Sequence, residues 1–342
     1  MPADNLNPNH TVCPEALHAA VHHALTGAAL PLVAAEHGLN HDELHDAVEV
    51  FLRAGASALY EYSSDPDWYS AHLEFSDWDQ AERIALLTFE PLLNIWTGSG
   101  LLERWWFIRK APAWRLRLQP GPNAGDILVP TANDLFDKLV TSHTLADWRP
   151  VRYEPEAHAF GGPTGIRLAH QLFHADSVHL FAYLAHDQPP IGIRELSILL
   201  CTVLFRAADQ EGFETGDIWH RVTYLRPSTG HDSSTSTGHH TELTEQLRTL
   251  LRYDTHPGGP LFGDDGPLHE LQPWAQAFHD CGHALAAVNH TNQLHRGLRN
   301  VLAHHVIFHW NRCGFDQPTQ HALAHAAATT AFELRPEPDP PP

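Results

Sequence analysis

Apolar and polar residues follow a helical period over most of the chain. Residues 14–62 predict a small helical unit, in which Asn40 and Glu43 have the spacing of a capping box. The last helix of this unit is expected to end at Gly55, after an apolar face of Leu44, Ala47, Val48, Phe51 and Leu52. Asp176 and Ser177 are interpreted as the cap of a later helix. The period predicts the remaining helices at 79–96, 163–177, 178–186, 193–210, 241–253, 273–289, 291–312 and 316–334.

An alternating pattern replaces the helical period in two places. A half-buried strand is predicted at 68–76, where polar residues alternate with Tyr69, Ala71, Leu73 and Phe75. The stretch RWWFIRKAPAWRLRLQP (104–120) predicts two strands broken around Pro112. Arg115 and Arg117 project from one face of the second strand, opposite an apolar face. Such a pair can clamp a carboxylate or a peptide carbonyl, and an exposed face with ordinary salt bridges is the alternative.

Charge and composition exclude several classes of protein. With 43% hydrophobic and 18% charged residues, the chain is a folded protein. Its 21 Lys and Arg against 41 Asp and Glu give a net charge of −20, which argues against a general nucleic-acid or anionic-membrane binder. Four separated cysteines, no signal peptide and no apolar stretch of membrane-spanning length predict a cytoplasmic location. A positive strip is still expected at Arg104, Arg109, Lys110, Arg115 and Arg117.

Histidine is unusually frequent, with 29 copies. Seven pairs have i,i+4 spacing, which raises the question of a metal site on a helix face. The segment HDCGH (279–283) has Asp280 where a zinc protease carries glutamate. Solvated helix faces explain the pairs better, so no metal and no other cofactor is predicted.

The stretch YEPEAHAFGG (153–162) is too short of apolar residues for a core and too rigid for a linker. Elsewhere the chain has no nucleophile elbow, and GGPTG (161–165) lacks the lysine of a P-loop. These absences argue against nucleotide-dependent chemistry and covalent hydrolysis.

Five stretches in order along 66–330 resemble the thiopeptide-type bacteriocin biosynthesis domain: WWFIRKAPAWRLRL, YEPEAHAFGG, FHADS, the helix pair IRELSILLC…GDIW, and HWNR. That domain is the glutamate-elimination part of class I lanthipeptide dehydratases and of their stand-alone relatives. The resemblance implies an α+β fold, with an antiparallel sheet packed with helices. We expect a helical N-terminal module at 1–62, a catalytic domain at 63–334 with a mobile loop at 227–240, and a disordered tail at 335–342.

The chain departs from the pattern of the eliminating enzymes at three positions. Those enzymes carry Tyr-x-Pro-Glu-x-x-Arg-Tyr-Gly-Gly and a histidine four residues before the asparagine of the Asn-Arg pair. Here Ala159 replaces the arginine, Phe160 the second tyrosine and Ile307 the histidine. An enzyme that expels glutamate needs a fixed cation, which alanine cannot supply. The resemblance is therefore strongest to the pyridine synthases, which join two dehydroalanines of a modified precursor peptide by a formal [4+2] aza-cycloaddition and then release water and the leader peptide.

This resemblance suggests roles for ten residues, with a structural role as the alternative for each. The candidates for proton transfer are Tyr153, Glu156, His158, Ser197 and His309. Ser197 is expected on the polar side of its helix. The candidates for substrate binding are Arg109, Arg115, Arg117, Asn311 and Arg312, the last two by orienting backbone.

Two other functions stay open at this point. One is a split dehydratase eliminase that releases glutamate from glutamyl-Ser/Thr. The other is a precursor-binding scaffold without catalysis. The expected partner is the modified precursor peptide with its leader, which the module at 1–62 would help to dock. A homodimer and transient contacts with upstream azole-forming and dehydratase enzymes are compatible with this assignment, and nucleic acid and membrane are not expected partners.

Overall fold

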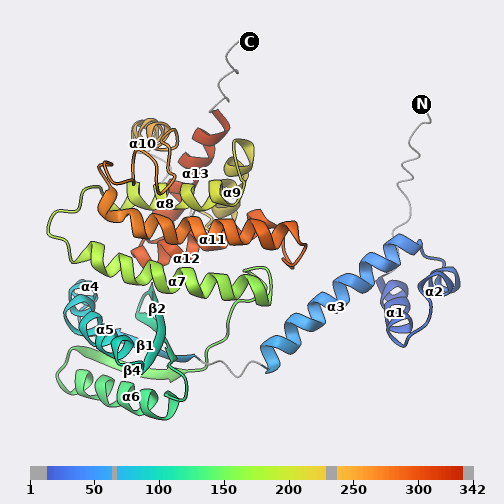
Figure 1. The fold of residues 1–342 in the computed structure, drawn as a ribbon, viewed down its shortest axis with the longest axis horizontal. Coiled ribbons are helices and arrows are strands. Elements are labelled where there is room, and N and C mark those ends of the chain that lie inside the picture. The colour runs from blue at the N-terminus through green and yellow to red at the C-terminus, as the bar shows by residue number, and fades with distance from the viewer. Residues whose placement is uncertain (1–13, 64–67, 229–236, 334–342) are drawn as a thin grey trace, which may run out of the picture. The chain divides into compact units, whose positions relative to one another are not determined.

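The computed structural model describes residues 14–63, 68–228 and 237–333. The chain divides into two compact units, residues 1–64 and 65–342 (Figure 1). The tail at 335–342 and most of the expected loop at 227–240 lie outside the described residues. In the described part of the chain, no helix has both the length and the apolarity needed to cross a membrane.

The first unit consists of three helices, α1 (Pro14–Leu25), α2 (Leu30–His37) and α3 (His41–Ser63). Its core contains Ala20, Val21, Val33, Ala34 and Leu44. Asn40 caps α3 as predicted, because its Oδ1 accepts the N–H of Asp42 at 2.7 Å. The prediction that this helix ends at Gly55 is wrong, since α3 continues to Ser63. A single glycine lowers helix stability without ending the helix.

The second unit contains an antiparallel sheet of β1 (Tyr69–Phe75), β2 (Leu102–Lys110), β3 (Ala113–Pro120) and β4 (Leu145–Val151) in the order β2-β3-β1-β4. The three predicted strands are confirmed, including the break at Pro112. The sequence did not assign β4 or the preceding α6 (Gly125–Thr141). In Figure 1 the sheet lies between α6 and the helices that follow β4.

The helices of this unit are α4 (Ala81–Ile84), the π-helix η1 (Ala85–Phe89), α5 (Glu90–Gly98), α7 (Pro163–Leu184), α8 (Ile193–Ala207), α9 (Phe213–Leu225), α10 (Thr237–Leu250), the 3-10 helix η2 (His269–Leu271), α11 (Gln272–His290), α12 (Leu298–Cys313) and α13 (Gln317–Glu333). α7 and α12 both contact β2. The predicted loop at 227–240 extends too far, since α10 already begins at Thr237. The helix predicted to start at residue 291 is α12, which begins seven residues later, at Leu298.

One boundary error matters for the site. The predicted break at Asp176 and Ser177 is wrong, because α7 is continuous and both side chains are fully buried. Instead of capping, the Ser177 hydroxyl donates to the carbonyl of Phe173 within the helix at 2.7 Å. The polar residues here point into the protein, where Asp176 meets other helices.

Candidate active site

The second residue of the predicted arginine pair lies inside an aromatic cluster at the sheet. Arg117 on β3 is paired in register with Trp106 on β2, and its side chain is only 8% exposed. The guanidinium carbon lies 4.4 Å from the ring centre of Trp106 and 5.6 Å from that of Tyr153. Its Nη1 donates to the carbonyl of Arg115 at 2.7 Å, whereas Nε has no partner among the described residues. Burial lowers the pKa of Arg117 to about 10, so it stays a cation at neutral pH.

Tyr153 belongs to the same cluster and has a histidine partner. Its hydroxyl lies 2.6 Å from Nε2 of His170 on α7. Burial lowers the pKa of His170 to about 3 and raises the pKa of Tyr153, against the effect of the Arg117 cation. At neutral pH the hydrogen-bonded pair therefore consists of a protonated tyrosine and a neutral imidazole. Trp68 covers the pair, with its ring centre 5.0 Å from that of His170 and 6.1 Å from that of Tyr153.

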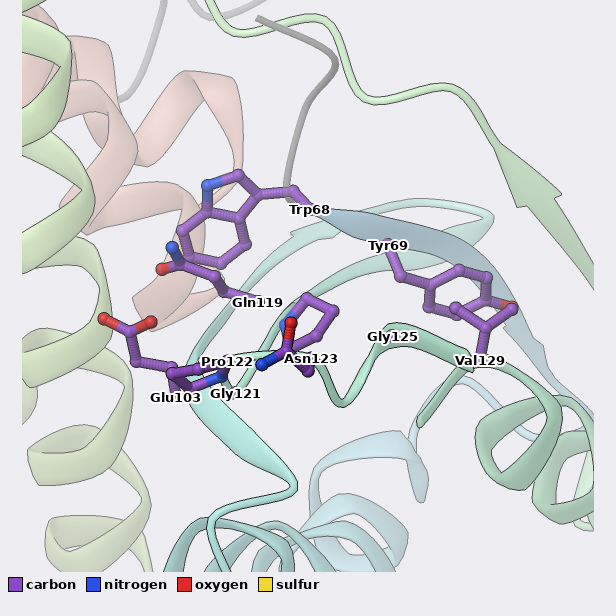
Figure 2. Close-up of a pocket in the computed structure, with 10 residues that line it drawn as sticks. Trp68, Tyr69, Glu103, Gln119, Gly121, Pro122, Asn123, Gly125 and Val129 are labelled. Atoms are coloured by element: carbon purple, nitrogen blue, oxygen red, sulfur yellow. The ribbon is translucent and has the colours of Figure 1, made fainter. Parts of the chain in front are cut away.

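Trp68 also lines a pocket of about 560 Å³ beside this cluster. Figure 2 shows Trp68, Gln119 and Glu103 toward one end of the pocket, and Tyr69 and Val129 toward the other. Tyr153 and Arg117 are not among the residues that line it, and Trp68 contacts Tyr153 as well as lining the pocket. The Oε1 of Gln119 is buried and accepts no hydrogen bond from the described residues.

The turn at 153–162 brings Tyr153 to the sheet and leads into α7. Gly161 and Gly162 have φ of 84° and 91°. A Cβ on Gly161 would lie 2.8 Å from Cδ2 of Leu294, so both the conformation and the packing require glycine. Phe160 is fully buried against Phe173 and Phe308, with ring centres 5.2 Å and 4.9 Å away.

A second polar cluster lies among the helices and centres on Asp176. Its Oδ2 accepts from Nε of Arg312 at 2.5 Å, and Nδ1 of His309 lies 2.9 Å from the same oxygen. Nε1 of Trp274 donates to Oδ1 at 2.9 Å. Phe173 lies between the two clusters, because its ring contacts Trp106 on the sheet side and the Arg312 guanidinium on the other.

In this second cluster, each charged group shifts the pKa of its neighbours toward the charged form. Burial would raise the pKa of Asp176, but Arg312 and His309 outweigh it and lower that pKa to about 2. Burial would likewise lower the pKa of His309, but the Asp176 carboxylate raises it to about 10. His309 is thus an imidazolium, 1% exposed and held by its carboxylate partner. Arg312 binds a carboxylate rather than backbone, which corrects its expected role.

The other predicted site residues are dispersed. Glu156 and His158 are exposed on the turn, and Glu156 is close enough to Arg117 to raise its pKa. Arg115 is half-buried beside Arg117 on β3. Arg109 pairs with Glu82 at 2.5 Å and stacks on Trp114.

Ser197 and Asn311 are held by neighbouring helices. The prediction that Ser197 lies on a polar helix side is wrong, because the residue is fully buried. Its hydroxyl donates to the carbonyl of Arg194 and accepts from Nε1 of Trp310. The amide oxygen of Asn311 accepts from Nε2 of Gln320 at 2.9 Å.

Sequence reasoning missed Trp68, His170 and Asp176. His170 and His174 form one of the seven i,i+4 histidine pairs, and in the structure this spacing marks the face of α7 that packs on β2. Nδ1 of His174 lies 3.0 Å from the carbonyl oxygen of Trp105 on that strand. A pair of histidines on an otherwise apolar helix face was therefore the signal for polar contacts with the sheet.

The fold and these motifs define a class of protein. The chain belongs to the family described as lantibiotic biosynthesis dehydratase C-term, whose family model matches residues 68–331. The α+β fold and the family expected from the sequence are confirmed.

Among solved structures, the chain is similar to MibB, a tRNA-dependent lantibiotic dehydratase from Microbispora sp. 107891, with 16% identity and a TM-score of 0.56 over 79% of this chain. This chain spans only 28% of that protein. It is similar also to TbtD, a pyridine synthase from thiomuracin biosynthesis, with 11% identity and a TM-score of 0.53 over 78% of this chain and 98% of that one. TsrL matches with 15% identity and a TM-score of 0.49 over 79% of this chain and 99% of that one. At these identities the likeness shows the fold. The comparison with curated proteins returns no match.

Proposed function

We propose that this chain is a pyridine synthase of thiopeptide biosynthesis. It would act on a ribosomally made precursor peptide that already bears azoles and two dehydroalanines. The reaction forms two C–C bonds between the two alkenes and the iminol form of one amide. The ring then expels the iminol oxygen as water and the leader peptide as its carboxamide. This sequence is redox-neutral, so the proposal includes no cofactor.

The observation that carries the proposal is a retained cation beside a tyrosine, at a turn that lacks the eliminase groups. Arg117 and Tyr153 face each other within the aromatic cluster. Ala159 is half-buried, and Phe160 and Ile307 are buried. A glutamate-expelling site needs a cation at the departing carboxylate, whereas cycloaddition chiefly needs two alkenes held in reacting geometry.

The sheet cluster suits the tautomer change that this reaction requires. Converting an amide to its iminol moves a proton from nitrogen to oxygen. Arg117 would stabilise negative charge on that oxygen, with its unpaired Nε as the donor. Tyr153 would donate a proton to the same oxygen, because burial keeps its hydroxyl protonated at neutral pH. Glu156 and His158 would exchange protons with solvent at the exposed side of the turn.

The remaining candidates receive roles that match their contacts. Arg115 would bind peptide carbonyls beside Arg117, and Arg109 would hold the end of β2 against Glu82. His309, Arg312, Ser197 and Asn311 would support the helices behind the cluster. The pocket beside Trp68 would hold part of the precursor, with an azole stacked on the indole. The modified precursor with its leader would be the partner, and a homodimer and transient contacts with upstream enzymes belong to the same proposal.

Mass spectrometry of the purified chain with two synthetic peptides tests this function. One peptide bears thiazoles, two dehydroalanines and a leader, and the other bears a glutamyl-serine ester. The proposal predicts free leader carboxamide and a pyridine-containing macrocycle from the first peptide, and no change in the second. Loss of glutamate from the second peptide alone would establish the eliminase instead. Binding of either peptide without conversion would establish the scaffold.

A further inference from the structure

The N-terminal unit brings together three side chains that can bind metal. His23 lies in the last turn of α1, and Glu36 and His37 lie in the last turn of α2. Each offers one ligand atom, and these atoms all lie within 4.8 Å of one another. Within the described residues, no other group of three or more His, Cys, Asp or Glu side chains brings its ligand atoms this close together.

The separation between the ligand atoms of His23 and Glu36 matches a tetrahedral zinc site. Two ligands about 2.05 Å from a tetrahedral zinc ion lie about 3.3 Å apart. Nδ1 of His23 and Oε2 of Glu36 are 3.4 Å apart, which is longer than the usual range of about 2.7–3.2 Å for an N–H···O hydrogen bond. The rings of His23 and His37 have centres 6.0 Å apart and planes inclined by 71°, so they meet edge to face and do not stack.

The backbone beneath these side chains is fixed by packing. The buried residues Ala20 and Val21 of α1 pack with Val33 and Ala34 of α2 in one core. Gly38 ends α2 in the left-handed region, directly after His37, and its N–H bonds to carbonyls within the helix. Ligands held on packed helix ends need little rearrangement to bind an ion.

No i,i+4 histidine pair supplies two ligands of this cluster, because His37 pairs with His41 at that spacing and His23 belongs to no such pair. His23 precedes Glu36 and His37 by 13 and 14 residues, and only the turn between the two helices brings them together. The fold therefore creates a group of ligands that the i,i+4 spacing of histidines does not indicate.

We propose that His23, Glu36 and His37 bind a divalent transition-metal ion of the zinc type, with water as the fourth ligand. Two imidazoles with one carboxylate are ligands that zinc prefers, whereas calcium and magnesium take oxygen ligands. The ion clasps the end of α1 to the end of α2 and so stabilises the N-terminal unit.

Zinc titration of the full chain tests the proposal. Chelator-treated protein is titrated with zinc chloride against a chromophoric competitor, which reports affinity and stoichiometry. His23→Ala and His37→Ala are each expected to lower the zinc affinity of the tightest site by more than about 10-fold. Even loss of a residue that only hydrogen-bonds a metal ligand lowers affinity by about that factor. The control variant carries His41→Ala and His45→Ala, which removes the nearest i,i+4 pair on α3 and should leave that affinity unchanged.

X-ray absorption at the zinc edge provides a second readout that is independent of enzymatic activity. The expected spectrum has nitrogen and oxygen neighbours, with imidazole scattering that diminishes in either histidine variant. The three side chains are at least partly exposed, so these variants should fold, which far-UV circular dichroism checks. Unchanged zinc affinity in the His23→Ala/His37→Ala double variant would overturn the proposal, as would loss of the site in the control variant.

Discussion

The hydroxyl of Tyr153 is the atom on which the proposed proton transfer depends. Burial raises the pKa of Tyr153, so the tyrosine is protonated at neutral pH. Its partner His170 is neutral, because burial lowers the pKa of that imidazole to about 3. Beside the Arg117 cation, the protonated hydroxyl can donate its proton to an oxygen of the substrate that develops negative charge. A phenylalanine at position 153 would keep the packing and lose this chemistry.

Replacing Tyr153 by phenylalanine is therefore expected to lower kcat for macrocycle formation by about 10²–10⁴-fold, the range for a positioned acid or base. KM should change much less, because the ring contacts with Trp68 and Trp106 remain. Steady-state kinetics by mass spectrometry measures both. Tyr183→Phe is the matched control. Tyr183 is also buried, but its hydroxyl donates to the carbonyl of Ile191, away from the cluster around Arg117 and Tyr153. Equal kcat in the two variants would remove Tyr153 from the mechanism.

His305 makes stability depend on pH in one direction. It is fully buried, its ring nitrogens have no partner in the described part of the chain, and burial lowers its pKa to about 3. An unfolded histidine has a pKa of about 6.5, so the unfolded state takes up the proton first as pH falls. His305 therefore lowers the free energy of unfolding by about 1.4 kcal/mol per pH unit as pH falls from about 6.5 to about 3.

Urea unfolding of His305→Leu should show a shallower loss of stability with falling pH, by about that slope. The exposed His283 gives a control variant, His283→Leu, whose pH curve should run parallel to that of the natural chain. If the His305→Leu curve is also parallel, the histidine does not stay neutral in the folded protein.

At the scale of elements, Asp176 joins three helices. α7 provides the carboxylate, α12 provides Arg312 and His309, and α11 provides Trp274. All of these charges are buried, so each depends on the others for compensation. Removing the carboxylate would leave two cations unpaired within the helical layer.

Asp176→Asn is accordingly expected to lower the free energy of unfolding by about 3–5 kcal/mol, as for a buried pair that loses one partner. Asp217 provides the control, because it bonds to Arg221 and Arg299 at 2.9 and 3.0 Å in a more exposed position. Asp217→Asn should cost about 1 kcal/mol or less. Chemical denaturation compares the two, and equal losses would mean that the buried network contributes no more than a surface pair.

The sequence predicted elements where one local pattern dominated, and it failed where distant contacts decide. Alternation identified β1 and β3, because one face of each carries regularly spaced apolar residues, and the continuous apolar run 105–108 indicated β2. Asp176 followed by Ser177 has the composition of a helix cap, and only contacts with residues distant in sequence, such as Arg312 at a separation of 136 residues, explain a buried aspartate in mid-helix. Arg117 and Tyr153 were found because they lie in recognisable motifs. Their partner His170 was missed, since its spacing to His174 fits an exposed face equally well.

At the scale of the whole molecule, the chain separates the proposed chemistry from its N-terminal helices. The unit at 65–342 contains the sheet cluster, the pocket and the Asp176 network. The family match begins at residue 68, within that unit. The unit at 1–64 has its own small core, and α3 exposes Leu52 and Leu59, which lie seven residues apart on one face. An apolar helix face of this kind suits a leader peptide that binds as an amphipathic segment.

Removing residues 1–64 is expected to raise KM for the leader-bearing precursor by about 10-fold, equivalent to about 1.4 kcal/mol of lost binding, and to leave kcat unchanged. Steady-state kinetics with full-length and shortened leaders measures this effect. The shortened leader is the control, because the two forms of the enzyme should process it with equal kcat/KM. Circular dichroism first checks that residues 65–342 fold alone. A fall in kcat with unchanged KM would mean that the N-terminal unit contributes to the reaction, because a docking element alters binding of the substrate and its transition state equally.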